Sequence, residues 1–315
     1  MVYETFETLI AAELQNRLGD DYQLIPQTAS KNNGLLLRGL CVRRKGDFAA
    51  PTIYLDNCFT RYQQGTSLEF LVNEILRVYY ENINLLRKDY SILNDFSQLK
   101  DKVAYKLIHT QSNQELLADI PSIPYMDLSI VFYLRLEKNE HEQITCPIHN
   151  HNLEQWNTSA EELYRLACAN TPRMFPPEVQ SMALLMAELV CQQENLQATE
   201  ELVARILSAP GVTPLFVLTN NTGVNGACTI LYPNALKNFA QLLNQDLIIL
   251  PSSIHEVLLM PMDDEANLEE LSSIVALINR SEVPVQDRLS NHVYFYSRQT
   301  DSVHMVQGSE TSPLS

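Results

Sequence analysis

The sequence predicts an α+β protein made of two mixed α/β lobes joined by a helical segment. Apolar residues recur at helical spacing in some stretches, and short β-rich runs separate these stretches. Short polar turns, one of them an Asn-Gly pair, connect neighbouring runs and favour antiparallel pairing. Hydrophobic residues make up 45% of the 315 residues and charged residues 19%, which suffices for a core without disulfides or metals.

Residues 1–150 are predicted to form the N-terminal lobe. Its first helix is expected over residues 3–18, because apolar residues recur on one face and Gly19 follows as a stop. The Asn33-Gly34 pair tolerates positive φ and predicts a β-hairpin. The other expected elements are hairpin strands at 22–28 and 35–43, a strand at 51–55, a helix capped by Ser67, a strand at 102–110, a short helix at 113–120, and strands at 126–137 and 143–148.

A helical connector is predicted over residues 151–210. Ser159 and Glu162 form a capping-box pattern where its first helix begins. Further connector helices are expected near 178–192 and 198–208.

The C-terminal lobe, residues 211–306, is predicted to run β-β-α-β-β-α-β-β with a largely antiparallel sheet. Its strands are expected near 215–219, 227–231, 246–250, 254–260, 292–297 and 302–306, and its helices near 233–244 and 265–279. Polar residues dominate the last stretch, 307–315, which is expected to be a disordered tail.

The charge balance argues against a nucleic-acid or membrane-surface partner. Acidic residues number 38 and basic residues 22, so the net charge is −16 and repels phosphate groups. The one basic cluster, Arg38 with Arg43, Arg44 and Lys45, is interpreted as a solvated strand end. The sequence contains no apolar run long enough for a membrane span, no basic signal segment and no CxxC pair among its six cysteines, so we expect a cytoplasmic protein with reduced thiols.

The segment from Leu215 to Met262 is the first place to expect a site. Its polar loop, residues 220–226, joins two apolar runs, and its Asn and Gly residues could arrange backbone amides to bind an anion. A phosphate-binding P-loop is excluded because no Lys-Ser/Thr pair and no helix follow. A plain connection between strands is the favoured interpretation. The candidate residues are Asn220, Asn221, Gly223, Asn225, Tyr232, Ser253, His255 and Glu256.

The pair His255-Glu256 is expected on a strand, where adjacent side chains point to opposite faces and cannot act together without a bulge. A zinc HExxH site is excluded because Leu259 stands where the second histidine would be. Ser252 or Ser253 could act as a nucleophile with His255 as its base, but the glycine pattern of a nucleophile elbow is missing. A structural role, with hydrogen bonds across the sheet or to the Asn loop, is favoured.

Two other groupings could hold a metal, although none is expected to. His149 and His151 would share one face of a strand, and the sequence places further donors nearby. These donors are His141, Glu142 and Glu154. Asp56 and Asp127 are carboxylates at strand edges that would bind a divalent cation only if they converged.

Several phrases together resemble a known family. They are IYLDNCF with GTSLEFLV, YKLIHTQSNQELLADIPSIPYMDLSIVFY, LEQWNTSAEELYRLACANTPR, and LTNNTGVNGACTILYPNALKNFA with LIILPSSIHEVLLMP. The chain resembles the bacterial family known as domain of unknown function 5688, found mainly in anaerobic Gram-positive bacteria. The phrase Leu-Pro-Ser-Ser-x-His-Glu-Val is also similar to one in a second uncharacterised bacterial family. The resemblance implies a bacterial cytoplasmic protein and carries no activity.

Two functions are compatible with these patterns. The first is a non-enzymatic protein-binding or accessory factor, indicated by the acidity of the chain and the absence of a catalytic constellation. The alternative is a hydrolase or small-ligand-binding protein with its site at the 220–226 loop and His255-Glu256. No cofactor is expected, and the sequence does not indicate an oligomeric state. The alternative requires the loop and His255 to lie at the same end of the sheet.

Overall fold

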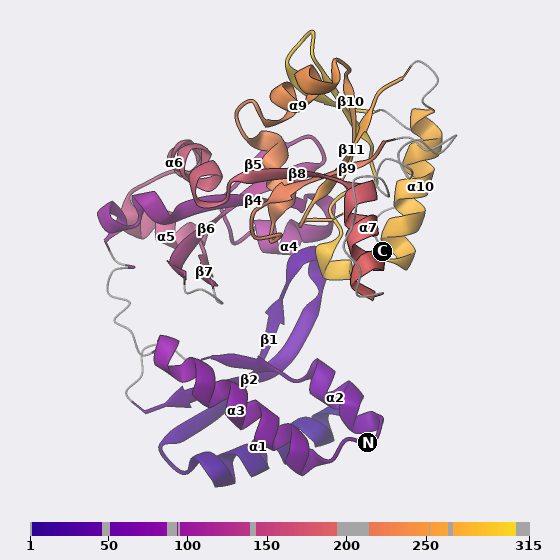
Figure 1. Cartoon of the computed structure of the whole chain (residues 1–315). Coiled ribbons are helices and arrows are strands. Elements are labelled where there is room, and N and C mark those ends of the chain that lie inside the picture. Colours follow the sequence, from indigo (N-terminus) through magenta and orange to yellow (C-terminus); the bar gives the residue numbers. More distant parts are fainter. Residues whose placement is uncertain are drawn as a thin grey trace. The chain divides into compact units, whose positions relative to one another are not determined.

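The computed structural model describes residues 2–45, 51–86, 93, 95–138, 143–193, 214–251, 253–263 and 267–306. The chain divides into two units, Met1–Leu93 and Asn94–Ser315 (Figure 1). The expected division near residue 150 differs from this one. Strands before residue 150 and helices after it pack together in the second unit, so no boundary separates them there.

In its described residues, the first unit combines a three-stranded antiparallel sheet with three α-helices. Its elements are α1 (Tyr3–Leu18), β1 (Tyr22–Ser30), β2 (Leu36–Arg44), β3 (Thr52–Tyr54), α2 (Asp56–Gln63) and α3 (Leu68–Leu86), with the sheet order β1-β2-β3. The hairpin turn forms as expected, because Asn33 at φ 58° and Gly34 at φ 70° take up the left-handed backbone. The core joins α1 to α3 and the sheet through fully buried side chains such as Phe6, Ile10 and Leu71.

Helix α2 was not expected from the sequence. It begins directly after β3, and Asp56 in its first turn accepts hydrogen bonds from Arg38 of β2, at 2.7 Å from the backbone nitrogen and 2.8 Å from Nη2. The basic cluster at the end of β2 is therefore partly neutralised by this ion pair. The capping of α3 by Ser67 is confirmed, since its Oγ accepts from the amide of Phe70 at 3.2 Å.

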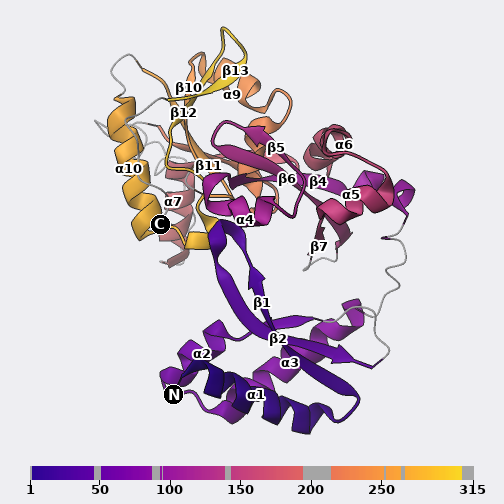
Figure 2. The ribbon, with the colours of Figure 1, turned by 180° about the vertical axis from the view of Figure 1, so that it is seen from behind.

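The second unit contains two antiparallel sheets (Figure 2). In the four-stranded sheet, the long strand β6 pairs with three other strands. This sheet and the elements around it comprise β4 (Val103–His109), α4 (Gln114–Leu117), β5 (Ser122–Tyr125), β6 (Leu128–Lys138), β7 (Gln143–Pro147), α5 (Asn150–Trp156) and α6 (Ala160–Met174). Helix α6 packs on β4, and its expected cap is confirmed because Ser159 Oγ accepts from the amide of Glu162 at 3.3 Å.

The six-stranded sheet has the order β13-β12-β10-β11-β9-β8, with every neighbouring pair antiparallel. Its strands are β8 (Pro177–Ser181), β9 (Phe216–Asn220), β10 (Leu247–Leu250), β11 (Val257–Pro261), β12 (Tyr294–Ser297) and β13 (Ser302–Met305), accompanied by α7 (Met182–Gln193), α9 (Ala235–Leu243) and α10 (Leu268–Ser281). The predicted α+β class with largely antiparallel sheets is thus confirmed.

Two expected elements take another form. Residues 177–181 begin no helix but form the edge strand β8, because they pair with β9. Residues 227–231 are part of a 3₁₀ helix, Gly226–Leu231, not a strand, and its residues from Gly226 to Ile230 are all buried. An apolar run buried on all sides shows no period that distinguishes strand from helix. The expected helix near 198–208 and the tail 307–315 lie outside the described residues. Among the residues described, no helix is long and apolar enough to cross a bilayer.

Candidate functional site

The candidate loop and His255 lie beside each other where β9 ends and β11 begins, at one end of the strands of the six-stranded sheet. Strands β9 and β11 are antiparallel neighbours, so the loop that follows β9 meets the bend that precedes β11. The amide of Asn225 donates to His255 Nδ1 at 3.3 Å, and Thr219 Oγ1 donates to the carbonyl of His255 at 2.8 Å. The loop and the histidine are therefore tied together by direct hydrogen bonds.

A glycine makes this close approach feasible. A Cβ placed on Gly226 would lie 2.1 Å from Thr219 Oγ1, 2.4 Å from the carbonyl oxygen of His255 and 2.8 Å from the amide nitrogen of Asn220. Two of these three atoms belong to the backbone and cannot rotate away. Only glycine fits between the loop and the bend.

The loop amides are already satisfied within the protein. Asn220 is buried, and its Oδ1 accepts from the amide of Thr222 at 2.9 Å while its Nδ2 donates to the carbonyl of Val224. The amides of the five residues 221–225 each donate, in order, to Pro176 O, Asn220 Oδ1, Asn220 O, Thr222 Oγ1 and His255 Nδ1. An anion would find no free amide among them. These bonds argue against the anion-binding interpretation and favour the plain connection between strands.

Both ring nitrogens of His255 are also engaged. Since Nδ1 accepts from an amide, the proton of the neutral ring is on Nε2, which donates to Asp287 Oδ1 at 3.3 Å. The hydroxyl of Ser253 lies 3.0 Å from the backbone nitrogen of His255 and accepts from it. This serine is thus positioned by the main chain, not by the imidazole. Ser252, the other serine considered as a nucleophile, lies outside the described residues.

His255 and Glu256 do line one pocket, contrary to the expectation of opposite faces. Strand β11 begins only at Val257, so both residues belong to the bend before it. The pocket, of about 430 Å³, is lined by Gly223, Ser253, His255, Glu256, Glu282, Val283, Pro284 and Asp287. Its carboxylates, Glu256, Glu282 and Asp287, give it an acidic character. We refer to it as the acidic pocket.

The remaining candidate residues lie near this pocket or elsewhere. Asn220 and Asn225 shape the loop, whereas the amide of Asn221 is bonded to Pro176 on the β8 side. Tyr232 does not join them. This residue is 4% exposed and lines a different pocket. Its hydroxyl lies 3.9 Å from Cys228 Sγ. Sequence reasoning missed Asp287 and Glu282, because they follow a helix distant in sequence and carry no motif.

A second polar cluster, the Asp127 network, joins the two sheets of the second unit. Asp127 lies in the tight turn between β5 and β6 and accepts hydrogen bonds from three residues near the start of β12. Ser290 Oγ is at 2.6 Å, His292 Nδ1 is at 3.0 Å, and the hydroxyl of Tyr294 also donates. His109 at the end of β4 approaches to 3.9 Å. The network positions β12 against the four-stranded sheet.

Burial and hydrogen bonding set the protonation states in this network. Burial would raise the pKa of Asp127, but donors from His292, Ser290 and Tyr294 together hold it below its ordinary value. The hydrogen bond to Asp127 raises the pKa of His292, whereas burial lowers the pKa of His109. In the described residues no hydroxyl or thiol is hydrogen-bonded to the other ring nitrogen of His292. The hydroxyl of Ser290 donates to Asp127 and not to an imidazole, which favours a structural role for the network.

In the described part of the chain, the side chains considered as metal donors make other contacts. His149 Nδ1 is 2.7 Å from Asp119 and its ring stacks on His151, while His141 and Glu142 lie outside the described residues. Asp56 belongs to the first unit and is bound by Arg38. No group of three metal-ligating side chains occurs among the residues described.

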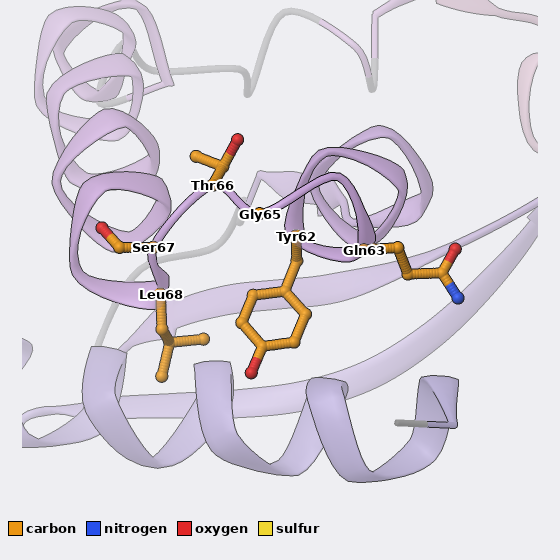
Figure 3. A pocket seen from close by; sticks show the side chains of 6 residues that line it. All are labelled: Tyr62, Gln63, Gly65, Thr66, Ser67 and Leu68. Atoms are coloured by element: carbon orange, nitrogen blue, oxygen red, sulfur yellow. The ribbon is translucent and has the colours of Figure 1, made fainter.

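The first unit has a hollow of about 770 Å³ at the turn between α2 and α3 (Figure 3). Figure 3 shows Tyr62 and Leu68 pointing toward the helix beneath them, consistent with the packing of Tyr62 on Phe6 at 5.2 Å between ring centroids. The other lining residues are Gln63, Gly65, Thr66 and Ser67. Among the described residues that line the hollow, the polar groups are hydroxyls and one side-chain amide.

The comparisons with known proteins concern family membership alone. No curated protein and no solved structure matches the chain. A family described as "Family of unknown function (DUF5688)" matches residues 3–298, which is nearly the whole chain. The resemblance noted in the sequence phrases is thereby confirmed, and the protein belongs to this family.

Proposed function

We propose that the protein is a non-enzymatic binding factor that docks a basic, amphipathic segment of another protein on helix α10 and the acidic pocket. The observation that carries the proposal is a second apolar stripe on α10. Ile274 is 44% exposed, Leu277 64% and Ile278 44%, and their spacing places them on one side of the helix. The adjoining face already packs into the core through Val275 and Leu271. An amphipathic surface helix needs only one apolar face.

The stripe runs directly into the acidic pocket. Glu282 follows α10, and its amide donates to the carbonyl of Ile278 at 2.8 Å, so the two residues are neighbours one turn apart. Glu282, Val283 and Pro284 then form one wall of the pocket. A helical partner lying along the stripe would bring its next side chain to the three carboxylates.

Charge complementarity defines the partner. Three carboxylates line the pocket, and the whole chain carries a net charge of −16. A lysine or arginine side chain is the complement of such a pocket, and apolar side chains one turn apart are the complement of the stripe. The partner is therefore a protein segment with a cationic and an apolar face, not a nucleic acid.

A hydrolase at the same place is less well supported. A general base needs a free ring nitrogen within reach of its substrate. His255 uses both nitrogens within the protein. The proposal also places the protein in the bacterial cytoplasm, which is supported by the free thiols of five of the six cysteines, Cys41, Cys58, Cys146, Cys168 and Cys228.

A synthetic amphipathic helix of leucine and lysine, about 18 residues long, tests the proposal by fluorescence anisotropy. We expect it to bind the full chain, and we expect the same peptide with glutamate in place of lysine to bind about tenfold more weakly or not at all. Leu277→Asn should weaken binding by about tenfold. The matched control is Leu242→Asn, which changes a leucine on α9 that is 79% exposed.

Either of two results would contradict the proposal. If Leu277→Asn and Leu242→Asn bind the lysine peptide with the same affinity as the unchanged chain, α10 is not the docking surface. Equal affinity for the lysine and glutamate peptides would remove the role of the acidic pocket. Leu277 is mostly exposed, so neither variant is expected to unfold the protein.

A further inference from the structure

A separate pocket of about 350 Å³ lies between the β5–β6 turn, the segment leading into α9, and the β12–β13 hairpin. Three tyrosines, Tyr125, Tyr232 and Tyr296, line it together with aliphatic side chains. One lysine and one carboxylate, Lys237 and Asp301, complete it. A few placed polar groups among apolar and aromatic walls are typical of small-molecule sites. We refer to it as the tyrosine pocket.

The lysine of this pocket is held in place by a relay of side chains. The hydroxyl of Tyr296 donates to Asp301 Oδ1 at 2.5 Å, and Lys237 Nζ donates to Asp301 Oδ2 at 2.7 Å. Each carboxylate oxygen of Asp301 thus accepts one hydrogen bond. An ammonium group has three N–H donors, and Asp301 uses one of those on Lys237. The remaining donors are available to an anion in the pocket.

The tyrosine walls are neutral, and two rim residues adopt the left-handed backbone that asparagine and aspartate tolerate. Burial raises the pKa of Tyr125 to about 12, and burial followed by the bond to Asp301 raises the pKa of Tyr296 to about 12. Asn234 and Asp301 at the rim adopt left-handed backbone, with φ of 61° and 50°.

We infer that the tyrosine pocket binds a small aromatic carboxylate, with its ring among the three tyrosines and its carboxylate on Lys237. The planar rings that line the pocket favour an aromatic ligand through stacking and edge contacts. The ammonium group supplies a charge-assisted hydrogen bond to the carboxylate. Each oxygen of Asp301 already accepts one hydrogen bond within the protein, from Tyr296 or from Lys237. This site is independent of the docking surface on α10.

Isothermal titration of the full chain at low salt with 2-naphthoate, 2-naphthamide and 2-naphthylmethylamine tests the inference. The three probes share the ring and differ in carrying a negative, a neutral or a positive group. We expect 2-naphthoate to bind about tenfold more tightly than the amide, and the amine to bind most weakly. Lys237→Met should reduce the affinity for the carboxylate to that for the amide.

The control variant is Lys100→Met, which removes a lysine that lies 5.7 Å above the ring of Phe96 and lines a different pocket. It should bind 2-naphthoate as the unchanged chain does. Tyr125→Leu should weaken 2-naphthoate and 2-naphthamide alike, because it removes ring contacts and no charge. The inference is overturned if the acid and the amide bind equally, if Lys237→Met keeps the full affinity, or if none of the three probes binds. Urea unfolding followed by Trp156 fluorescence confirms that each variant is folded.

Discussion

Two histidine–aspartate pairs in the second unit look alike in composition and differ in construction. In the Asp127 network, the side chain of Asp127 is 14% exposed, and serine and tyrosine hydroxyls supplement the donor from His292. At the acidic pocket, the side chain of Asp287 is 25% exposed and accepts from His255 at 3.3 Å. The first pair is held by many side-chain hydrogen bonds. The second is held by the close backbone approach at Gly226.

This difference indicates different roles: the Asp127 network stabilises the fold, whereas the His255–Asp287 pair lies at a surface that we propose binds a partner. A buried carboxylate with several donors contributes strongly to stability, because removing it leaves those donors without a partner. A carboxylate at the rim of a pocket keeps contact with water and is free to meet another charge. We therefore expect changes at Asp127 to affect unfolding, and changes at the acidic pocket to affect binding.

The largest effect on stability is expected from Gly226→Ala. Its new methyl group would overlap two backbone atoms, those of His255 and Asn220, so the loop must move away from the bend. We expect a loss of about 3 kcal/mol or more in the free energy of unfolding, measured by urea denaturation with Trp156 fluorescence. The sequence has a single tryptophan, and it lies in the second unit, so the signal reports that unit alone.

Gly223→Ala is the matched control for this change. Gly223 has φ of 66°, but a Cβ there would meet no atom within 4 Å. It should cost only about 1 kcal/mol, from backbone strain alone. Equal losses for the two alanine variants would mean that the close approach at Gly226 does not hold the loop against His255.

The next largest effect is expected from Asp127→Ala. It leaves Ser290, His292 and Tyr294 without their shared acceptor, and we expect a loss of about 3 kcal/mol in the free energy of unfolding. Asp287→Ala, at the acidic pocket, should lose about 1 kcal/mol or less by the same measurement. Similar losses for both variants would remove the distinction between the two pairs.

The sequence predicted local features better than contacts between residues far apart in the chain. The hairpin at Asn33-Gly34 and the cap at Ser159 were predictable because their physics is local. The Asp127 network was not, because Asp127 and His292 are 165 positions apart and neither belongs to a motif. The meeting of the 220–226 loop with His255 could only be posed as a question, since it depends on β9 pairing with β11.

The same limits explain the misassigned elements. Strand β8 is fixed by its pairing with β9 across a long stretch of chain, and a helical period in its residues could not reveal that partner. The 3₁₀ helix Gly226–Leu231 is buried along nearly its whole length and shows no exposed face. Glu282 and Asp287 reach the acidic pocket through the chain that follows α10, and they could not be assigned to it from spacing alone.

A moderate gain in stability is expected from Met126→Gly. Met126 precedes Asp127 in the β5–β6 turn and has φ of 54°, a conformation that costs a side chain about 1 kcal/mol. Glycine removes this strain, and part of the gain is offset by the greater freedom of the unfolded chain. The unfolding midpoint should rise. Asn157→Gly, at φ 49°, is the control and should change little, because asparagine tolerates this backbone.

If Met126→Gly instead lowers the midpoint, then the methionine side chain contributes more through packing than its backbone costs. The packing of Met126 would in that case outweigh the backbone strain in the turn that holds Asp127. The Asp127 network would then have no strain to offset, and its hydrogen bonds would serve only to join the sheets.

The smallest effect is expected in the pH dependence of unfolding. His292 has a raised pKa, so its contribution to stability is complete below the ordinary imidazole pKa of about 6.5 and is lost as the pH rises through its folded value. His109 has a lowered pKa, so stability is lost as the pH falls below about 6.5 toward its folded value. The two opposing contributions place the maximum of stability near that pH.

In His292→Gln, the decline in stability on the alkaline side should disappear while the decline on the acidic side remains, as measured by urea midpoints from about pH 5 to about pH 9. An alkaline decline that persists unchanged would show that His292 gains nothing from Asp127 when it is protonated. The Asp127 network would then act through hydrogen bonds alone.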